Sequence, residues 1–381
     1  MGSLENALRD SGVLTDRRSI TRPSHLIRIF TPSVADEANT NAQNLTVKEV
    51  VARLDPELFH VTMISLSHPD PRIAQRKNTT LLPYCKHGNT LHLLLRALVA
   101  RPDIYFFPRY GPLDRAFLSA RKYFSRNTAL VTYVVMMMNE ETSGGMIERL
   151  ICEADRVYAN STFVAGTVHA RFGIRPDPVY DGADRRFFFP QSGDKRTSAR
   201  PVVLYAGSFQ ARKRVEVVIE QAARRADAEF RLAGGGVTES GCRSLAKQLG
   251  CANVVFLGHL TPAQLGEQMR EADVFLFPSV LEGHPQVLIQ ATACGLPSVA
   301  MSLYRPDAVV HGETGFLANN DQELAGNLDL LLDSAGLRQK MSAAAVRHAQ
   351  RFDWDRIAQQ WADIFQEIVR QNGHGRPATG I

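Results

Sequence analysis

The chain has little cysteine and no long apolar segment. Its five cysteines among 381 residues are odd in number and include no C-x-x-C pair, which favours reduced thiols in a cytosol over a disulfide framework. The longest strongly apolar run, Ala129 to Met138, is far shorter than the ~20 residues that span a bilayer. The first residues show neither a signal-peptide core nor a myristoylation signal. We therefore expect a cytoplasmic protein that at most contacts the inner face of a membrane.

Several motifs of catalysis and cofactor binding are missing too. The sequence has no G-x-x-x-x-G-K-[ST] loop, no G-x-S-x-G elbow and no H-x-x-x-H spacing. The dinucleotide fingerprint G-x-G-x-x-G fails after Gly234, because Glu239 occupies the last glycine position. Asp353 and Asp355 have the D-x-D spacing of a nucleotide-bound metal, but they lie where an aspartate caps a helix. We expect no resident metal or cofactor.

The composition is that of a folded protein with a regional excess of positive charge. Hydrophobic residues make up 44% of the chain and charged residues 22%, close to the averages for soluble globular proteins. Lysine and arginine number 44 against 39 acidic residues. Between Arg76 and Arg126, however, ten basic residues face two acidic ones. A basic excess of this kind favours an anionic partner or surface.

Apolar runs alternate with helical patterns in two series, which predicts an α/β protein with two Rossmann-like, doubly wound domains around a cleft. The runs predicted as strands are Ile27–Phe30 (closed by Pro32), Val61–Leu66, Ile104–Phe107, Leu130–Met137, Val157–Ala159, Val202–Tyr205, Glu229–Ala233, Val254–Leu257, Val274–Phe277 and Ser298–Ala300. The predicted organisation is a leader (1–25), an N-terminal domain (26–190), a linker (191–200), a C-terminal domain (201–352), a C-terminal helix (353–371) and a tail (372–381).

Two segments of the second series carry residues suited to a phosphate ligand. The strand ending at Tyr205 runs into Gly207 and then Arg212 and Lys213 before a helix, where fixed cations and backbone amides suit a diphosphate. The strand ending at Phe277 is followed by Glu282, a candidate aimed carboxylate. Each segment also has a plainer interpretation: a solvated basic turn for the first, and a helix-capping glutamate for the second.

One segment of the basic region has an amphipathic pattern. Residues 114–127, with the sequence DRAFLSARKYFSRN, interleave aromatic and basic side chains. Such a helix can lie on an anionic membrane surface. An ordinary helix with a solvated basic face has the same pattern, so both interpretations stay open.

Taken together, the motifs of the second series resemble the nucleotide-sugar-binding half of the family 4 retaining glycosyltransferases of the GT-B fold. The resemblance covers about residues 200–370 and is weaker before them. It implies that the C-terminal helix (353–371) crosses between the domains and returns to the N-terminal one. The motifs that carry it are GSFQARK (207–213), GGG (234–236), VFLG (255–258), ADVFLFPS (272–279), EGHP (282–285), ACGLPSVA (293–300), HGETGFL (311–317) and FDW (352–354).

Three positions depart from the family pattern. The second glutamate of the family's E-x₇-E pair, which contacts the nucleotide ribose in family members, is Gln290 here. The arginine of the family's G-R-x-x-x-x-K motif is Ser208, and Arg212 is positioned to supply that cation. The histidine that family members often carry after a strand of the N-terminal domain is absent from TYVVMMM at 132–138.

The resemblance implies a retaining, metal-independent transfer of a sugar from a nucleotide diphosphate sugar to an acceptor hydroxyl, in glycan, glycolipid or small-molecule synthesis. It assigns catalysis to Glu282, Lys213 and Arg212, and donor binding to Gly207, Ser208, Gly235, Gly236, Gly258, Gly283, His284, Pro285, Val287, Leu288 and Gln290. Acceptor-side candidates are Asn39, Asn41, Asn44 and Arg109. The alternatives are a nucleotide-sugar epimerase of the same fold, or a non-catalytic sugar-nucleotide-binding protein. No nucleic acid is expected as a partner.

Overall fold

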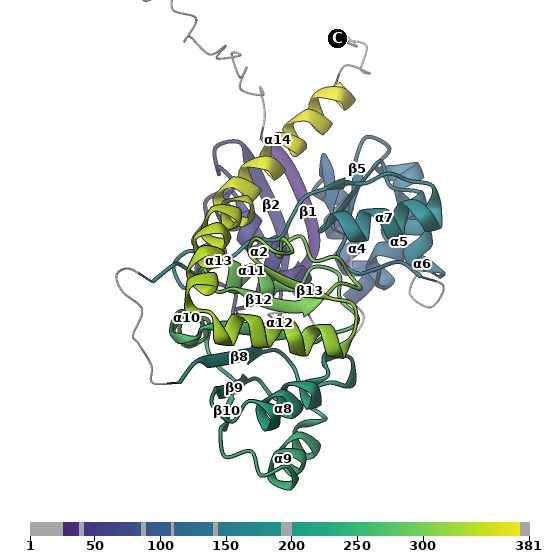
Figure 1. The fold of residues 1–381 in the computed structure, drawn as a ribbon. Coiled ribbons are helices and arrows are strands. Elements are labelled where there is room, and N and C mark those ends of the chain that lie inside the picture. Colours follow the sequence, from purple (N-terminus) through teal and green to yellow (C-terminus); the bar gives the residue numbers. More distant parts are fainter. Residues whose placement is uncertain are drawn as a thin grey trace, which may run out of the picture.

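A computed structural model describes residues 26–37, 42–84, 89–107, 110–139, 144–191 and 200–373. The strands form two separate sheets, each parallel throughout and flanked by helices (Figure 1). Parallel strands are covered on both faces and therefore carry continuous apolar runs, such as the fully buried VVLYA of 202–206. The expected pair of doubly wound α/β units is confirmed.

The first sheet has the strand order β3-β2-β1-β4-β5-β6-β7. Its strands are β1 (Ile27–Val34), β2 (Phe59–Ser65), β3 (Thr79–Pro83), β4 (Ile104–Phe106), β5 (Ala129–Val134), β6 (Arg156–Ala159) and β7 (Asp177–Pro178). The helices between them are α2 (Ala42–Arg53), α3 (Pro71–Ala74), α4 (Asn89–Val99), α5 (Pro112–Phe124), α6 (Met146–Cys152) and α7 (Thr162–Phe172).

The second sheet has the order β10-β9-β8-β11-β12-β13. Its strands are β8 (Val202–Ala206), β9 (Glu229–Ala233), β10 (Val254–Gly258), β11 (Val274–Phe277), β12 (Ser298–Met301) and β13 (Gly315–Ala318). Its helices are the short η1 (Ala211–Lys213), α8 (Val215–Arg224), α9 (Glu239–Gln248), α10 (Pro262–Glu271), α11 (Gln286–Ala293), α12 (Asp321–Asp333), α13 (Ala335–His348) and the short η2 (Ala349–Phe352).

The last helix, α14 (Trp354–Gly373), returns to the first sheet, as the sequence predicts. Figure 1 shows it leaving α13 and running beside β1 and β2. The Trp361 ring is fully buried there, 4.8 Å from the ring centre of Phe106 and 5.2 Å from those of Tyr133 and Tyr158. Burial of a large aromatic side chain contributes about 1.5–3 kcal/mol to stability, so α14 is part of the core of the first unit.

The chain passes between the two units at two adjacent places. The amide of Ala183 donates to the carbonyl of Phe352 at 2.8 Å, and Ala183 forms a parallel bridge with Asp353. Gly182 lies so close to Trp354 that a Cβ would be 2.8 Å from its ring. Ala183 and Phe188 already belong to the core of the second unit. The first crossing therefore precedes the segment predicted as a linker, of which residues 192–199 lie outside the described chain.

Some strand boundaries differ from the sequence prediction. The strand β1 does not end at Pro32 but continues to Val34, with a shift of register between Phe30 and Val34. Proline has no N–H to give to the ladder, and it is tolerated here because the strand pairing is irregular in this stretch. The strand β5 ends at Val134 rather than Met137. Among the described residues, no helix has the length and apolar character needed to cross a membrane.

Candidate functional site

Three loops at the carboxyl ends of β8, β9 and β10 are joined by backbone hydrogen bonds. The amide of Gly207 donates to Ala233 at 3.0 Å, and that of Gly234 donates to Gly258 at 2.7 Å. Gly234 is required by packing, because a Cβ there would lie 1.9 Å from the carbonyl oxygen of Gly207. The glycine-rich turn therefore brings these loops together at the edge where open α/β sheets bind ligands.

The candidate catalytic residues Glu282, Lys213 and Arg212 form one cluster beside this edge. One oxygen of Glu282, Oε1, is 2.6 Å from Lys213 Nζ and 2.8 Å from Arg212 Nη1. The same oxygen accepts a hydrogen bond from the hydroxyl of Ser279. Two cations share one carboxylate, so the cluster has a net charge of about +1 and favours an added anion.

Lys213 is held by its surroundings on two sides. Its ammonium lies 4.9 Å from the ring centre of Phe277, a favourable cation–π contact. Burial lowers the pKa of Lys213, and the neighbouring charge of Glu282 opposes that shift. Arg212 is less buried and also donates to the carbonyl of Leu281 at 2.8 Å. The short helix η1 thus aims both cations at the loop that carries Glu282.

The loop after Glu282 is pressed against the first unit. A Cβ at Gly283 would lie 2.3 Å from the carbonyl oxygen of Val135, directly after β5. The hydroxyl of Ser161 donates to the carbonyl of Gly283 at 3.3 Å. This is also where the sequence lacks the family's histidine, in the TYVVMMM segment. Glycine at 283 thus permits a close approach of the two units at this point.

The helix α11 begins directly after this loop and presents unsatisfied polar groups. Both side-chain polar atoms of Gln286 and the Oε1 atom of Gln290 are buried without a hydrogen-bond partner among the described residues. The two glutamines are one helical turn apart and therefore share a face. Buried polar groups normally have partners, so these amides are suited to a polar ligand at the start of α11.

The tyrosine Tyr304, which follows β12, belongs to the same region. Its hydroxyl is buried without a partner in the described part of the chain. Burial raises the pKa of Tyr304 well above its usual range, and the charge of Glu282 adds to the shift. A neutral hydroxyl near the carboxylate is thereby available to donate a hydrogen bond. Tyr304, Ser279 and Gln286 were not among the site residues predicted from sequence, although Ser279 is the last residue of the ADVFLFPS motif.

His284 has a different environment from the other candidates. Its ring is buried between Tyr180 and Phe352, at 5.7 and 5.6 Å between ring centres. Burial lowers the pKa of His284 to about 4, so the ring is neutral near pH 7. Both ring nitrogens lack hydrogen-bond partners among the described residues. The side chain packs where the two units meet, close to both chain crossings.

The remaining donor candidates contribute mainly backbone. Leu288 is fully buried, and its amide already donates to the carbonyl of Pro285 at 3.1 Å. Val287 packs partly against the core of the second unit.

The α-carbon of Gly235 faces the side chains of Glu239 and His259, and a Cβ there would be 3.0 Å from each. Ser208 accepts a hydrogen bond from Tyr205 through its carbonyl at 3.2 Å. Gly236 lies in the loop after β9, and Gly258 is the last residue of β10, at the same edge of the sheet.

Only one of the four acceptor-side candidates lies within the described residues. Asn44 is fully buried in α2, where its Oδ1 accepts the amide of Val34 at 2.9 Å. This contact gives the Asn44 side chain a structural role at the end of β1. The other three candidates, Asn39, Asn41 and Arg109, lie outside the described residues.

A buried carboxylate lies just before the first chain crossing. Asp181 accepts hydrogen bonds from Thr46 Oγ1 at 2.7 Å, Asn160 Nδ2 at 3.1 Å and Tyr133 Oη at 3.2 Å. Burial raises the pKa of Asp181 to about 6, and these hydrogen bonds oppose the shift. The residue links α2, β5 and β6 to the segment that leaves the first unit.

The D-x-D segment has the helix-capping role that the sequence predicts. The Asp353 carboxylate accepts the amide of Asp355 at 2.9 Å and pairs with Arg185 at 2.8 Å. Asp355 pairs with Arg53 of α2 at 2.6 Å. Across the described residues, no group of three or more His, Cys, Asp or Glu side chains has the arrangement of a metal site.

The protein has two parallel α/β units that meet near the cluster of Lys213 and Arg212, and its last helix returns from the second unit to the first. This arrangement defines the GT-B class of folds. Solved structures agree with this class. Sucrose-phosphate synthase from Thermosynechococcus elongatus matches with a TM-score of 0.72 and 20% identity, over 90% of this chain and 99% of that one. The Anabaena protein HepE, solved with UDP and glucose, matches with a TM-score of 0.73 and 18% identity, over 90% and 100%. The expected GT-B fold is confirmed.

The second unit also matches by sequence. Residues 189–348 match the family model described as Glycosyl transferases group 1, in agreement with the motifs of this part of the sequence. The D-inositol 3-phosphate glycosyltransferase of Streptomyces bingchenggensis is 30% identical over 250 residues, which are 58% of this chain and 55% of that protein. The enzyme of the same name from Mycobacterium bovis is 33% identical over 255 residues, 61% and 53%. The chain spans about half the length of these relatives.

Proposed function

We propose that the protein is a retaining glycosyltransferase that moves a sugar from a nucleotide diphosphate sugar to an acceptor hydroxyl. The observation that carries this proposal is the cluster of Lys213, Arg212 and Glu282 beside the start of α11. Lys213 and Arg212 would hold the diphosphate, and charge-assisted hydrogen bonds to phosphate are about twice as strong as neutral ones. The Gln286 amide and the Oε1 atom of Gln290, which lack partners in the described part of the chain, would bind other polar groups of the donor.

Leaving-group stabilisation is the proposed source of catalysis. Negative charge builds on the diphosphate as the bond to the sugar breaks, and fixed cations stabilise that charge where it develops. Lys213 and Arg212 would release part of their contact with Glu282 and turn to the phosphate oxygens. Glu282 would then be available to the donor sugar, where its negative charge favours positive charge on the ring. We propose that the two side-chain cations perform this work without a metal ion.

The identity of the substrates is proposed from the comparisons. A solved structure of the same fold contains UDP, and the curated relatives are named for D-inositol 3-phosphate. We therefore propose a UDP-sugar as the first donor to test and an inositol phosphate as the first acceptor. Glycans and glycolipids remain the wider acceptor classes predicted from the sequence. The predicted cytoplasmic location is tested by none of these observations and stays a prediction.

Product analysis tests the proposal. The full chain is first screened by thermal shift against UDP-, GDP- and ADP-sugars, and the stabilising donor is then incubated with acceptor candidates. We expect a glycoside whose anomeric configuration, determined by NMR, is that of the donor. An inverted product contradicts the retaining mechanism. A sugar epimer formed without acceptor identifies an epimerase, and tight donor binding without any product identifies a non-catalytic binding protein.

A further inference from the structure

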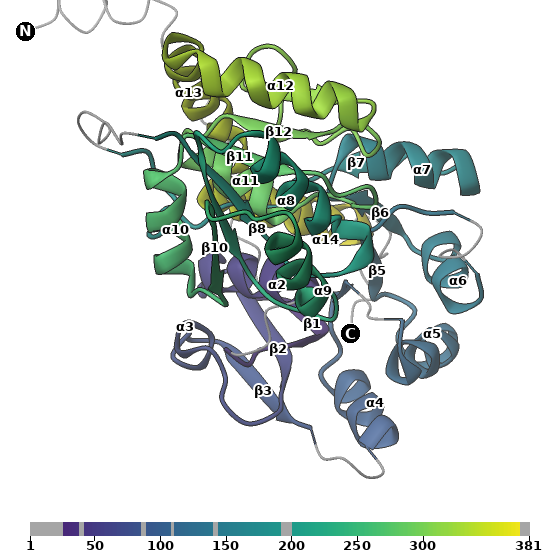
Figure 2. The ribbon, with the colours of Figure 1, turned by 60° about the horizontal axis from the view of Figure 1, so that its bottom comes forward.

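Two helices of the first unit form a layer far from the candidate site. Leu93 and Ala97 of α4 and Phe117 and Leu118 of α5 share one core on the same face of the sheet. The opposite faces of both helices therefore point to solvent. Figure 2 shows α4 and α5 next to each other at the margin of the molecule, away from α12 and α13, and the two helices are in direct contact.

The outer face of α4 carries an apolar stripe beside the exposed His92 and Arg96. Leu91, Leu95 and Val99 are 65%, 53% and 77% exposed, and their spacing of four residues places them in one stripe along the helix. Isolated exposed apolar residues are ordinary, but a contiguous exposed stripe marks an interaction surface.

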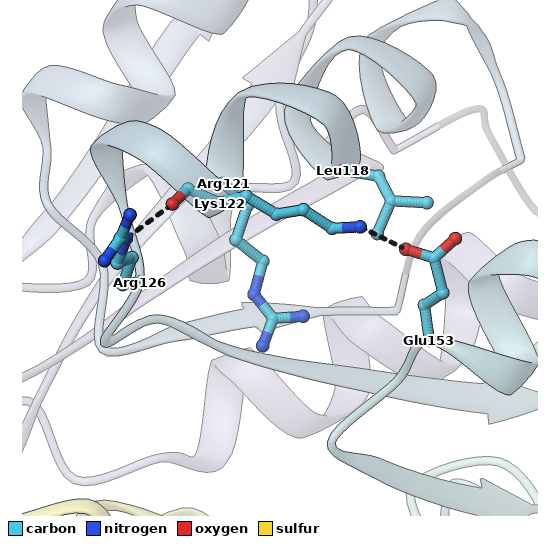
Figure 3. A pocket seen from close by; sticks show the side chains of 5 residues that line it. All are labelled: Leu118, Arg121, Lys122, Arg126 and Glu153. Carbon is cyan, nitrogen blue, oxygen red and sulfur yellow. Dashed lines mark hydrogen bonds and ion pairs between the residues drawn. The ribbon is translucent and has the colours of Figure 1, made fainter.

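The outer face of α5 and the turn after it is basic. Arg115 and Lys122 are exposed two helical turns apart and so lie along one side of α5, next to the 76% exposed ring of Tyr123. The exposed Arg126 of the following turn lies beside Lys122. Figure 3 shows the cavity of about 380 Å³ at the end of this row, where Lys122 extends to Glu153 at 3.8 Å. Arg126 folds back to the carbonyl of Lys122 at 2.6 Å.

The acidic residues of the same segment are directed inward. Asp114 is buried and accepts hydrogen bonds from Tyr105 Oη at 2.7 Å and from the amide of Gly111 at 2.8 Å. Asp103 accepts the amide of Arg28 at 2.9 Å. Two acidic residues that follow α6 offset part of the positive charge, because Glu153 pairs with Lys122 and Arg149, and the exposed Asp155 pairs with Arg121. The outward charge of α4 and α5 is therefore positive.

We propose that the outer face of α4 and α5 binds the surface of an anionic lipid bilayer. The apolar stripe of Leu91, Leu95 and Val99 enters the boundary between headgroups and acyl chains, while the basic row contacts anionic headgroups. Lysine and arginine suit this position because their long stems stay apolar and their charged ends reach the headgroups. The exposed apolar stripe lies beside cations, which fits the boundary between headgroups and acyl chains better than it fits an acidic protein.

Co-sedimentation of the full chain with vesicles tests the proposal. One set of vesicles is phosphatidylcholine alone, and the other contains phosphatidylglycerol in addition. Because each basic residue near an anionic surface contributes about 1 kcal/mol, we expect the double variant Lys122→Glu with Arg126→Glu to lose about 30-fold or more in affinity for anionic vesicles. Leu95→Ser with Val99→Ser should also weaken binding, and raised salt should weaken it for the unchanged protein.

A matched control separates this surface from overall charge. Lys247→Glu with Lys340→Glu makes the same change of charge on exposed residues of the second unit and should leave vesicle binding unchanged. Absence of binding to anionic vesicles at low salt, or equal loss in the control, overturns the proposal and leaves an acidic protein as the partner of this face. The readout is binding rather than turnover, so its failure is distinguishable from failure of the proposed function.

Discussion

The ammonium of Lys213 and the carboxylate of Glu282 lie 2.6 Å apart, with only about a tenth of each side chain exposed. A buried pair of this kind gains little net stability, because desolvation offsets the attraction. Removing one partner is costly, however, since the other charge is then left buried. The pair is therefore better explained by function: an anionic ligand can take over the cation, and the donor sugar can take over the carboxylate.

Replacement of Lys213 is the most direct test of the phosphate assignment. Lys213→Ala removes a charge-assisted contact worth on the order of 2 to 4 kcal/mol, so we expect donor affinity and turnover to fall by about 30-fold to 1,000-fold. Calorimetry with UDP and steady-state kinetics measure the two losses. The exposed Lys247→Ala should behave like the unchanged protein. Unchanged donor binding in Lys213→Ala would remove this residue from the site.

Substitution of Gln290 tests whether the start of α11 binds the donor. Gln290→Leu should weaken donor binding, because it removes a buried amide whose Oε1 has no other partner in the described chain. Gln290→Glu should bind donor at least as well, since a carboxylate accepts hydrogen bonds from ribose hydroxyls more strongly than an amide does. Calorimetry measures both, with exposed Gln322→Leu as the control. Equal donor affinity in Gln290→Leu would show that the residue is outside the site.

Metal independence is a separate prediction. We expect transferase activity to survive extensive treatment with EDTA, because Lys213 and Arg212 supply the positive charge proposed to stabilise the leaving group. The rate is measured before chelation, after chelation, and after addition of Mg²⁺ or Mn²⁺. Activity that is lost on chelation and restored only by a divalent cation contradicts the prediction.

The raised pKa of Asp181 predicts how stability changes with pH. Its pKa is 3.8 in the unfolded chain and about 6 in the folded one, so the folded state holds the proton more tightly. The stability that this group contributes is therefore complete below pH 3.8 and is lost as pH rises to about 6. The total loss is on the order of 3 kcal/mol.

Asp181→Asn should remove that pH dependence. An amide stays neutral and can still accept from Thr46 and Tyr133, so we expect the variant to be more stable than the unchanged protein at pH 8. Tryptophan fluorescence during urea unfolding is the suitable probe, because Trp354 and Trp361 both lie in the core of the first unit. The exposed Glu220→Gln serves as the control. A variant whose stability falls with pH as steeply as that of the unchanged protein argues against a protonated Asp181.

The second unit could be predicted from sequence more fully than the first. Its strands β8 and β11 are short apolar runs that end in recognisable turns, and Lys213 and Glu282 follow those turns directly. The edge strands β3, β7 and β13 carried weaker signals, because edge strands need fewer apolar residues. Tyr304 and Gln286 were missed because their importance depends on burial beside residues distant in sequence, which no local pattern records.

The first unit shows why a polar residue type alone is a weak predictor of a binding role. Asn44 had the residue type of an acceptor contact, but its carbonyl oxygen accepts the amide of Val34 at the irregular end of β1. A short polar side chain serves a backbone amide as readily as a ligand. Sequence alone did not separate the two uses, since they differ only in the direction of one side chain.

The return of α14 to the first sheet has a consequence for biosynthesis. Trp361, Phe365 and Ile368 of α14 belong to the same core as Ile27, Val61 and Phe106, near the other end of the chain. A ribosome makes the strands of the first unit long before it makes the helix that covers them. The second unit, whose core residues all precede Trp354, has its complete core sequence earlier. We infer that the unit synthesised first is the last to reach its native packing.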